Sequence, residues 1–181
     1  MGQHEIFPGA GDQFGLNDTT QSFFFSPKKP AGGWLIWGAG PVIYLPTGTD
    51  ELLSAEKWGL GPTAVALTQA GPWTIGILAN HIWSVAGDED RADLNSTFLQ
   101  PFVSYTTKDA WTFSLNTEST YNWTTAEWSV PVNAQVTKLF KLGDQPISMG
   151  PGVRYWADSP ESGAHDWGFR WTTTLLFPTG G

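Results

Sequence analysis

The sequence predicts an all-β chain, folded as an antiparallel, up-and-down transmembrane β-barrel with about nine strands. Three observations lead to this prediction. Turn residues divide the chain into segments of strand length, several segments alternate apolar and polar residues, and large aromatic residues stand at both ends of the apolar faces. The 11 tryptophans, 21 glycines and 13 prolines also favour strands and turns over helices.

Composition limits the partners and the chemistry of the chain. The 181 residues carry a net charge of −8, which argues against nucleic acid as a partner because phosphate binding requires clustered Lys and Arg. The absence of cysteine excludes a disulfide framework and a Cys-based metal site. The mean hydropathy is −0.20, and no window holds 18 uncharged apolar residues, which excludes helical membrane spans. These values do not exclude the strands of a membrane barrel, because alternating apolar and polar residues average to a neutral hydropathy.

Nine segments are expected to form strands, and residues 1–17 are expected to form an irregular leader or loop ahead of a barrel domain at 18–181. Trp, Thr, Val, Phe and Tyr are frequent in these segments, and turn residues separate them. The nine segments are 18–27, 33–46, 58–69, 72–86, 96–107, 110–123, 127–141, 145–157 and 166–178.

The connections between these segments alternate between short and long. The short ones lie at 28–32, 69–71, 108–109 and 142–144, and the long ones at 47–57, 87–95, 124–126 and 158–165. In a meander, alternate connections lie at the same end, so one end has tight turns and the other has longer loops, as in outer-membrane barrels. Lysines gather near the turn end and acidic residues at the loop end, although polar loops alone would also give part of this pattern.

Segment 110–123 gives the clearest alternation. One face carries Trp111, Phe113, Leu115, Thr117, Ser119, Tyr121 and Trp123, and the opposite face is polar throughout. Segment 127–141 repeats the pattern, with an apolar face that also contains Lys138. Segment 33–46 differs because both of its faces are apolar, so we expect it to pack against a further element.

Eight large aromatic residues are expected to form two outward-facing belts at the membrane interfaces. Paired on single faces, they stand 10 or 12 residues apart, which is roughly 33–40 Å along a strand. A tilt of about 45° projects this to roughly 23–28 Å, the height of a lipid-facing band. The belt at the loop end consists of Trp83, Trp123, Trp128 and Trp167, and the belt at the turn end of Trp73, Trp111, Phe140 and Phe177. The alternative is that they fill a soluble core.

Several stretches of the chain resemble a bacterial outer-membrane family. They include GGWLIWGAGPVIYLPT (32–47), EKWGLGPTAVAL (56–67), GPWTIGILANHIWSVAGDEDRADLN (71–95), FLQPFVSYTT (98–107), TFSLNTESTYNW (112–123), GVRYWADSP (152–160) and DWGFRWTTTLLFP (166–178). Members of this family are labelled as putative transporters or as "MetA-pathway of phenol degradation" proteins. The resemblance implies a barrel in the outer membrane and a role in uptake of small compounds. The phenol named in the family label is an aromatic example of such a compound.

The chain departs from the family at its N-terminus, where members have a signal sequence and additional strands. No signal peptide is expected after Met1, because no charged and then apolar stretch follows it. The chain thus looks like a truncated member. Nine strands would also place the first and last in the same direction, whereas single-chain barrels normally have an even number. Residues 3–16 could supply a tenth strand, or the first and ninth strands could pair in parallel, but we expect another chain or missing N-terminal strands to complete the barrel.

No catalytic residue, metal site or cofactor is expected. His4, His81 and His165 match no metal-ligand spacing, and no nucleophile motif such as GxSxG is present. The polar faces of the strands are instead expected to line the lumen, because a charged side chain that faces lipid is costly. The lumen residues are Asn116, Glu118, Asn133, Gln135, Arg154 and Arg170. The charged ones form either a ring that selects solutes or an internal salt-bridge network.

The sequence therefore predicts a passive pore or transporter for small solutes in the bacterial outer membrane, with lipid and a small-molecule solute as partners. Two alternatives remain open at this point. One is a non-conducting structural or interaction barrel, and the other is a soluble, Trp-rich β-sandwich that binds carbohydrate.

Overall fold

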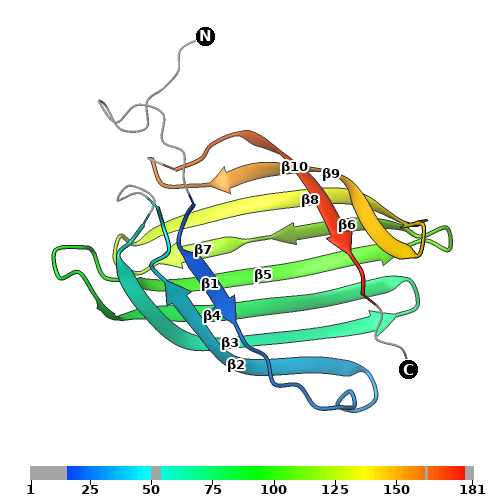
Figure 1. The fold of residues 1–181 in the computed structure, drawn as a ribbon, viewed down its shortest axis with the longest axis horizontal. Helices are drawn as coiled ribbons and strands as arrows, with labels where there is room; N and C mark the ends of the chain where they lie inside the picture. The colour runs from blue at the N-terminus through cyan, green and yellow to red at the C-terminus, as the bar shows by residue number, and fades with distance from the viewer. Residues whose placement is uncertain (1–15, 50–53, 162, 178–181) are drawn as a thin grey trace, which may run out of the picture.

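The computed structural model describes residues 16–49, 54–161 and 163–177. It contains a single antiparallel sheet of ten strands in up-and-down order (Figure 1). The described residues include no helix long and apolar enough to cross a membrane. The strands are β1 (Thr19–Ser22), β2 (Leu35–Leu45), β3 (Lys57–Ala70), β4 (Trp73–Gly87), β5 (Asn95–Thr106), β6 (Trp111–Thr117), β7 (Ser119–Asn122), β8 (Glu127–Leu142), β9 (Gln145–Asp158) and β10 (Trp167–Leu175).

Each segment expected from the sequence contains a strand, which confirms the all-β, up-and-down part of the prediction. Segment 110–123 contains two, because β6 and β7 lie in line between β5 and β8. They are interrupted at Glu118, whose N–H donates to the carbonyl of Pro131 at 3.1 Å. Pro131 has no N–H with which to return a hydrogen bond, so the ladder is broken there. The sheet therefore has nine strand positions along its path.

The first strand is shorter than the predicted segment 18–27, because β1 ends at Ser22. The chain beyond it still follows β2, with the N–H groups of Phe23 and Phe25 donating to Pro41 and Ala39, each at 2.9 Å. The predicted leader at 1–17 lies outside the described residues up to residue 15. The apolar second face of β2 contains the fully buried Val42.

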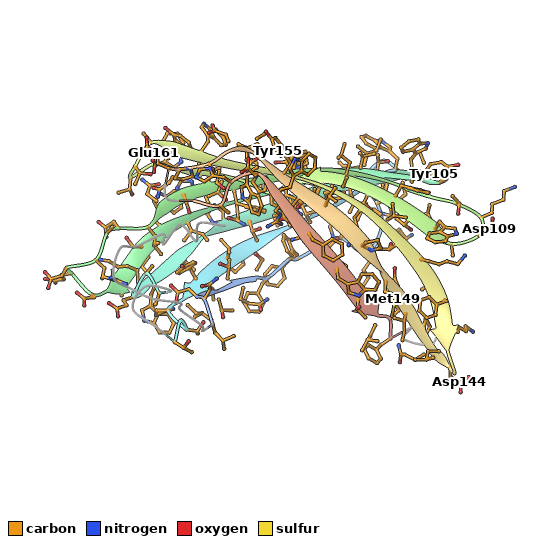
Figure 2. The ribbon with its side chains drawn as sticks, turned by 90° about the horizontal axis from the view of Figure 1, so that it is seen from above. Tyr105, Asp109, Asp144, Met149, Tyr155 and Glu161 are labelled. Carbon is orange, nitrogen blue, oxygen red and sulfur yellow. The ribbon has the colours of Figure 1, made fainter. Side chains whose placement is uncertain are left out.

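The sheet is curved into an open arch, and Figure 2 shows Tyr105 and Tyr155 on its convex side. β1 and β10 are the two edge strands. Among the described residues, no backbone hydrogen bond joins these two edges. The closed barrel predicted from the sequence is therefore not shown, and the finding is an open, curved antiparallel sheet.

Glycine explains how the sheet curves. The register places every glycine inside the described strands on the concave side, where neighbouring side chains converge. A Cβ at Gly61, for example, would overlap the carbonyl oxygen of His81 on the next strand. These glycines are Gly38, Gly40, Gly59, Gly61, Gly76, Gly150, Gly152 and Gly168, and Gly87 is the last residue of β4.

The described part of the chain has almost no apolar core. Its buried apolar side chains are Val42, Ile82 and Ile147, whereas about thirty large apolar residues are exposed. On β4, for example, Trp73, Ile75 and Ile77 alternate along the convex face and are all exposed. The convex side is thus mainly apolar, and most polar side chains of the strands lie on the concave side.

Candidate functional site on the concave face

The structure brings together the residues predicted to line a lumen. All six lie on the concave side of four neighbouring strand positions, at the β10 half of the sheet. Asn116 lies on β6, Glu118 lies between β6 and β7, Asn133 and Gln135 lie on β8, Arg154 on β9 and Arg170 on β10. The same side chains therefore form a continuous polar strip across the sheet.

Glu118 is the centre of this strip because two arginines share its carboxylate. Arg170 donates from Nη1 to Oε1 at 3.0 Å and from Nη2 to Oε2 at 3.3 Å, and Arg154 donates from Nη2 to Oε2. Charge-assisted hydrogen bonds of this kind are stronger than neutral ones. We call Glu118, Arg154 and Arg170 the charged cluster.

Asparagine side chains extend the charged cluster along the strip. Arg154 donates from Nε to Asn133 Oδ1 at 2.6 Å, and Asn133 Nδ2 donates to Asn116 Oδ1 at 2.7 Å. Asn133 is buried, so its hydrogen bonds offset the cost of removing an amide from water. Five members of the strip are therefore connected by one chain of hydrogen bonds, which runs from Asn116 through Asn133, Arg154 and Glu118 to Arg170.

Sequence reasoning missed two members of the strip, Thr172 and Trp156. Gln135 Nε2 donates to Thr172 Oγ1 on β10, and the Arg154 guanidinium lies 5.4 Å from the Trp156 ring centroid, in cation–π range. Thr172 follows Arg170 by two residues and so shares its face, which is a signal that the alternation contained. Trp156 likewise follows Arg154 by two residues and pairs with Pro131 in the same register, so the alternation contained this signal too.

Contact between Arg170 and Glu118 depends on the curvature of the sheet. Three inter-strand gaps separate β10 from β6, which is about 14 Å on a flat sheet. Glycine also makes room for the arginines, because Arg154 pairs with Gly168 across the β9–β10 ladder and Arg170 pairs with Gly152. The charged cluster therefore connects β9 and β10 to the segment between β6 and β7.

The charged cluster carries one more positive than negative charge. The side chain of Glu118 is 22% exposed and that of Arg170 is 37% exposed, so the excess positive charge faces the concave side rather than being sealed in. Guanidinium groups hydrogen-bond carboxylates and other planar anions through a fixed fork of donors. The cluster can therefore attract an anion while Glu118 keeps both arginines in place.

All eight aromatic residues predicted as belts are exposed, from 38% for Phe140 to 75% for Phe177; seven lie on the convex face, and Phe177 lies two residues beyond the end of β10. At the turn end, Trp73 packs edge-on to Tyr105 at 4.9 Å, and Lys138 Nζ lies 4.6 Å from the Trp111 ring. This contact accommodates the lysine on the apolar face.

At the loop end, rings from neighbouring strands contact each other. Tyr121 lies 4.8 Å from Trp123 and 4.9 Å from Trp128, and Tyr155 lies 5.0 Å from Trp167. His81 is part of this group rather than of the concave strip, with its ring 4.1 Å from Trp83 and its Nδ1 2.7 Å from Thr97 Oγ1.

Asp18 organises the loop between β2 and β3. Its carboxylate accepts hydrogen bonds from the N–H of Ala55 at 2.6 Å, the N–H of Gly48 at 2.8 Å and the Tyr44 hydroxyl at 3.0 Å. Partial burial alone would raise the pKa of Asp18, but these hydrogen bonds together with one from Ser54 outweigh burial and hold the pKa below its ordinary value.

The described residues contain no group of three His, Asp or Glu side chains placed to hold a metal ion. His165 Nδ1 lies 2.8 Å from Ser159 Oγ in the loop before β10, but its other nitrogen faces the backbone carbonyl of Glu161 at 3.2 Å. A catalytic triad needs a carboxylate at that position to orient the histidine. The concave strip therefore remains the best candidate site.

Comparisons with known proteins add no relative. A scan against protein-family models, a search of curated proteins and a search of solved structures each give no match for this chain.

Proposed function

We propose that this chain forms the wall of a β-barrel in the bacterial outer membrane and that its concave face lines a passive route for small solutes. One observation carries the proposal: the sheet is inverted relative to a soluble protein. Exposed apolar side chains dominate the convex face, and a strip of hydrogen-bonded polar and charged side chains crosses the concave face. Membrane barrels have this distribution, with an apolar outside and a polar lumen.

The absence of a core supports the same proposal. A soluble domain of this size buries most of its large apolar residues, whereas the described residues bury three. The exposed tryptophans at both ends of the convex face fit membrane interfaces, where one side of the ring meets lipid and the other meets water. The family resemblance of the sequence points in the same direction. A soluble carbohydrate-binding sandwich would require a second sheet to cover the convex face.

The proposal requires partners for the edges of β1 and β10, because unpaired N–H and C=O groups within lipid cost several kcal/mol each. The nine strand positions make β1 and β10 run in the same direction. Antiparallel closure therefore needs an odd number of further strands between them. We propose that another chain or further strands of the same protein supply them.

Membrane insertion and conductance test the proposal. We expect the chain to need detergent, to insert into phosphatidylcholine vesicles, and to raise the conductance of a planar bilayer in discrete steps. Quenching of tryptophan fluorescence by brominated lipids would follow insertion. Insertion without conductance would favour the non-conducting barrel, and a chain that stays monomeric in plain buffer and ignores vesicles would contradict the membrane proposal.

The charged cluster gives this pore a selectivity that can be measured. Because its excess charge is positive, we expect a preference for anions in reversal potentials across a KCl gradient. Arg154→Ala should reduce this preference and Glu118→Ala should increase it, whereas Thr117→Ala, on the convex face of β6, should leave it unchanged. Unchanged reversal potentials in both cluster variants would leave the cluster a purely structural role.

A further inference from the structure

A hollow lies on the concave face, at the β1 half of the sheet and away from the charged cluster. Its volume is about 430 Å³, and side chains of β1, β2, β4, β5 and β7 line it. This volume falls within the usual range of small-molecule sites. The cavity exists because β3 contributes glycine here: a Cβ at Gly59 would lie 2.6 Å from Ile82 Cγ2 and 2.9 Å from Tyr44 Cβ. β2 and β4 can therefore approach each other across β3.

The walls of this cavity combine apolar surface with uncharged polar groups. Leu78, Ile82 and Phe98 supply apolar surface, and the half-buried Asn80 and Gln100 supply primary amides. Among the described residues, the structure gives neither of these side-chain amides a hydrogen bond. Each amide offers two donors and an acceptor oxygen. A ligand that supplies hydrogen-bonding partners would therefore satisfy groups that the protein leaves open.

The cavity also discriminates against charge. None of its lining residues is charged. The nearest carboxylate to its Tyr44 wall, that of Asp18, already accepts hydrogen bonds from the Tyr44 hydroxyl, Gly48 and Ala55. A charged ligand would lose water here without gaining a counter-ion, which is costly.

We propose that this cavity is a binding site for a small neutral solute with an apolar body and an amide or hydroxyl group. The apolar part lies against Leu78, Ile82 and Phe98, and the polar part bonds with Asn80 and Gln100. The site goes beyond the proposed pore, because binding to it requires neither membrane insertion nor conduction.

Equilibrium binding of three matched probes tests the proposal. The full chain is kept in buffer or in detergent micelles, whichever keeps it dispersed, and protein-free solution serves as the blank. The probes at pH 7 are cyclohexanecarboxamide, cyclohexanecarboxylate and cyclohexylmethylammonium, which share a ring and differ in charge. We expect saturable binding of the amide and at least about tenfold weaker binding of both ions. No saturable binding of the amide, or equal binding of all three probes, would overturn the proposal.

Variants connect the binding to the cavity. Asn80→Leu and Gln100→Leu should each weaken binding of the amide by about three- to tenfold, because one hydrogen-bonding group is lost. Gln69→Leu is the matched control, since Gln69 is a glutamine on the same concave side but outside the cavity. Asn80→Asp, which is nearly the same shape, should weaken the amide and favour the ammonium probe. If Asn80→Leu, Gln100→Leu and Asn80→Asp all bind as Gln69→Leu does, the ligand lies elsewhere and the proposal fails.

Discussion

At the scale of single residues, polar side chains of this protein are held in pairs and triads rather than singly. Glu118 binds two arginines, Asn133 connects Arg154 to Asn116, and Asp18 accepts from a tyrosine hydroxyl and two backbone N–H groups. In a sheet with few buried apolar residues, such contacts fix the position of a strand or loop that packing does not fix.

The shared carboxylate of Glu118 should contribute to stability. Glu118→Gln leaves two guanidinium groups close together without an anion, so we expect the free energy of unfolding to fall by about 1–3 kcal/mol. This is less than for a fully buried pair, because the side chain of Arg170 is 37% exposed. Urea titration of the dispersed protein measures the change.

A double-mutant cycle separates the interaction of Glu118 with Arg170 from other effects of the substitutions. The variant Glu118→Gln with Arg170→Gln should lose less stability than the sum of the two single variants, because it removes acid and base together. Additive losses would mean that the 3.0 Å contact between these residues contributes nothing measurable.

Asp18 should make stability depend on pH. Its folded pKa is lowered from 3.8 by hydrogen bonds, so its contribution is fully present above the unfolded pKa and is lost as pH falls through the folded pKa. We expect Asp18→Asn to unfold more easily by about 1–2 kcal/mol above about pH 5. The difference from the natural sequence should shrink below about pH 4. A difference that stays constant down to pH 2 would show that the carboxylate is not the cause.

At the scale of elements, alternation and turn residues were enough to predict where the strands lie. Strands β4, β8 and β9 agree with the expected segments to within about two residues. The break at Glu118 was not predictable, because the alternation of 110–123 continues through it and its cause, Pro131, lies on a neighbouring strand. Register shifts at Trp58/Gly59 and Val130/Pro131 were hidden for the same reason, since they arise between strands.

The candidate site was predicted only in part, for a physical reason. Alternation identifies which residues share a face, so the six polar residues could be grouped. Alternation does not predict the curvature of the sheet. Curvature brings Arg170 within reach of Glu118 and forms the walls of the cavity that Asn80 and Gln100 line. Both depend on glycines whose role appears only when neighbouring strands are placed beside them.

Gly61 tests the role of glycine in the curvature of β3. A Cβ there would overlap the carbonyl oxygen of His81, so Gly61→Ala must displace backbone, and we expect a loss of more than about 3 kcal/mol in urea unfolding. Gly143→Asn is the control, because this turn glycine has a φ of 61° with nothing within 4 Å, and Asn tolerates that conformation. We expect the control to cost less than about 1 kcal/mol. Equal losses in the two variants would remove steric exclusion as the reason for Gly61.

At the scale of the whole molecule, the open edges decide how the chain assembles. β1 and β10 lie at opposite ends of the arch, and the described residues join them by no backbone hydrogen bond. The chain has no cysteine, so introduced pairs give an unambiguous signal. With Gln21→Cys on β1 and Thr173→Cys on β10, we expect no disulfide within one chain under oxidation, because bridged residues need Cα atoms within about 7 Å. Fast, complete intrachain cross-linking on non-reducing gels would show that the two edges meet in a barrel closed by this chain alone.

The placement of every strand-interior glycine on one face has a consequence for which substitutions the protein can accept. Convex positions such as Ile75, Ile77 and Phe113 require only an apolar side chain, so many substitutions there should preserve the fold. Concave positions such as Gly40, Gly61 and Gly150 have backbone where a Cβ would stand, so no exchange is neutral. A library of random variants, sorted for correctly folded protein, should therefore alternate between permissive and invariant positions along β2 and β9. Among the folded variants, the sequence of the polar, glycine-rich concave face would vary least, and that of the apolar convex face would vary most.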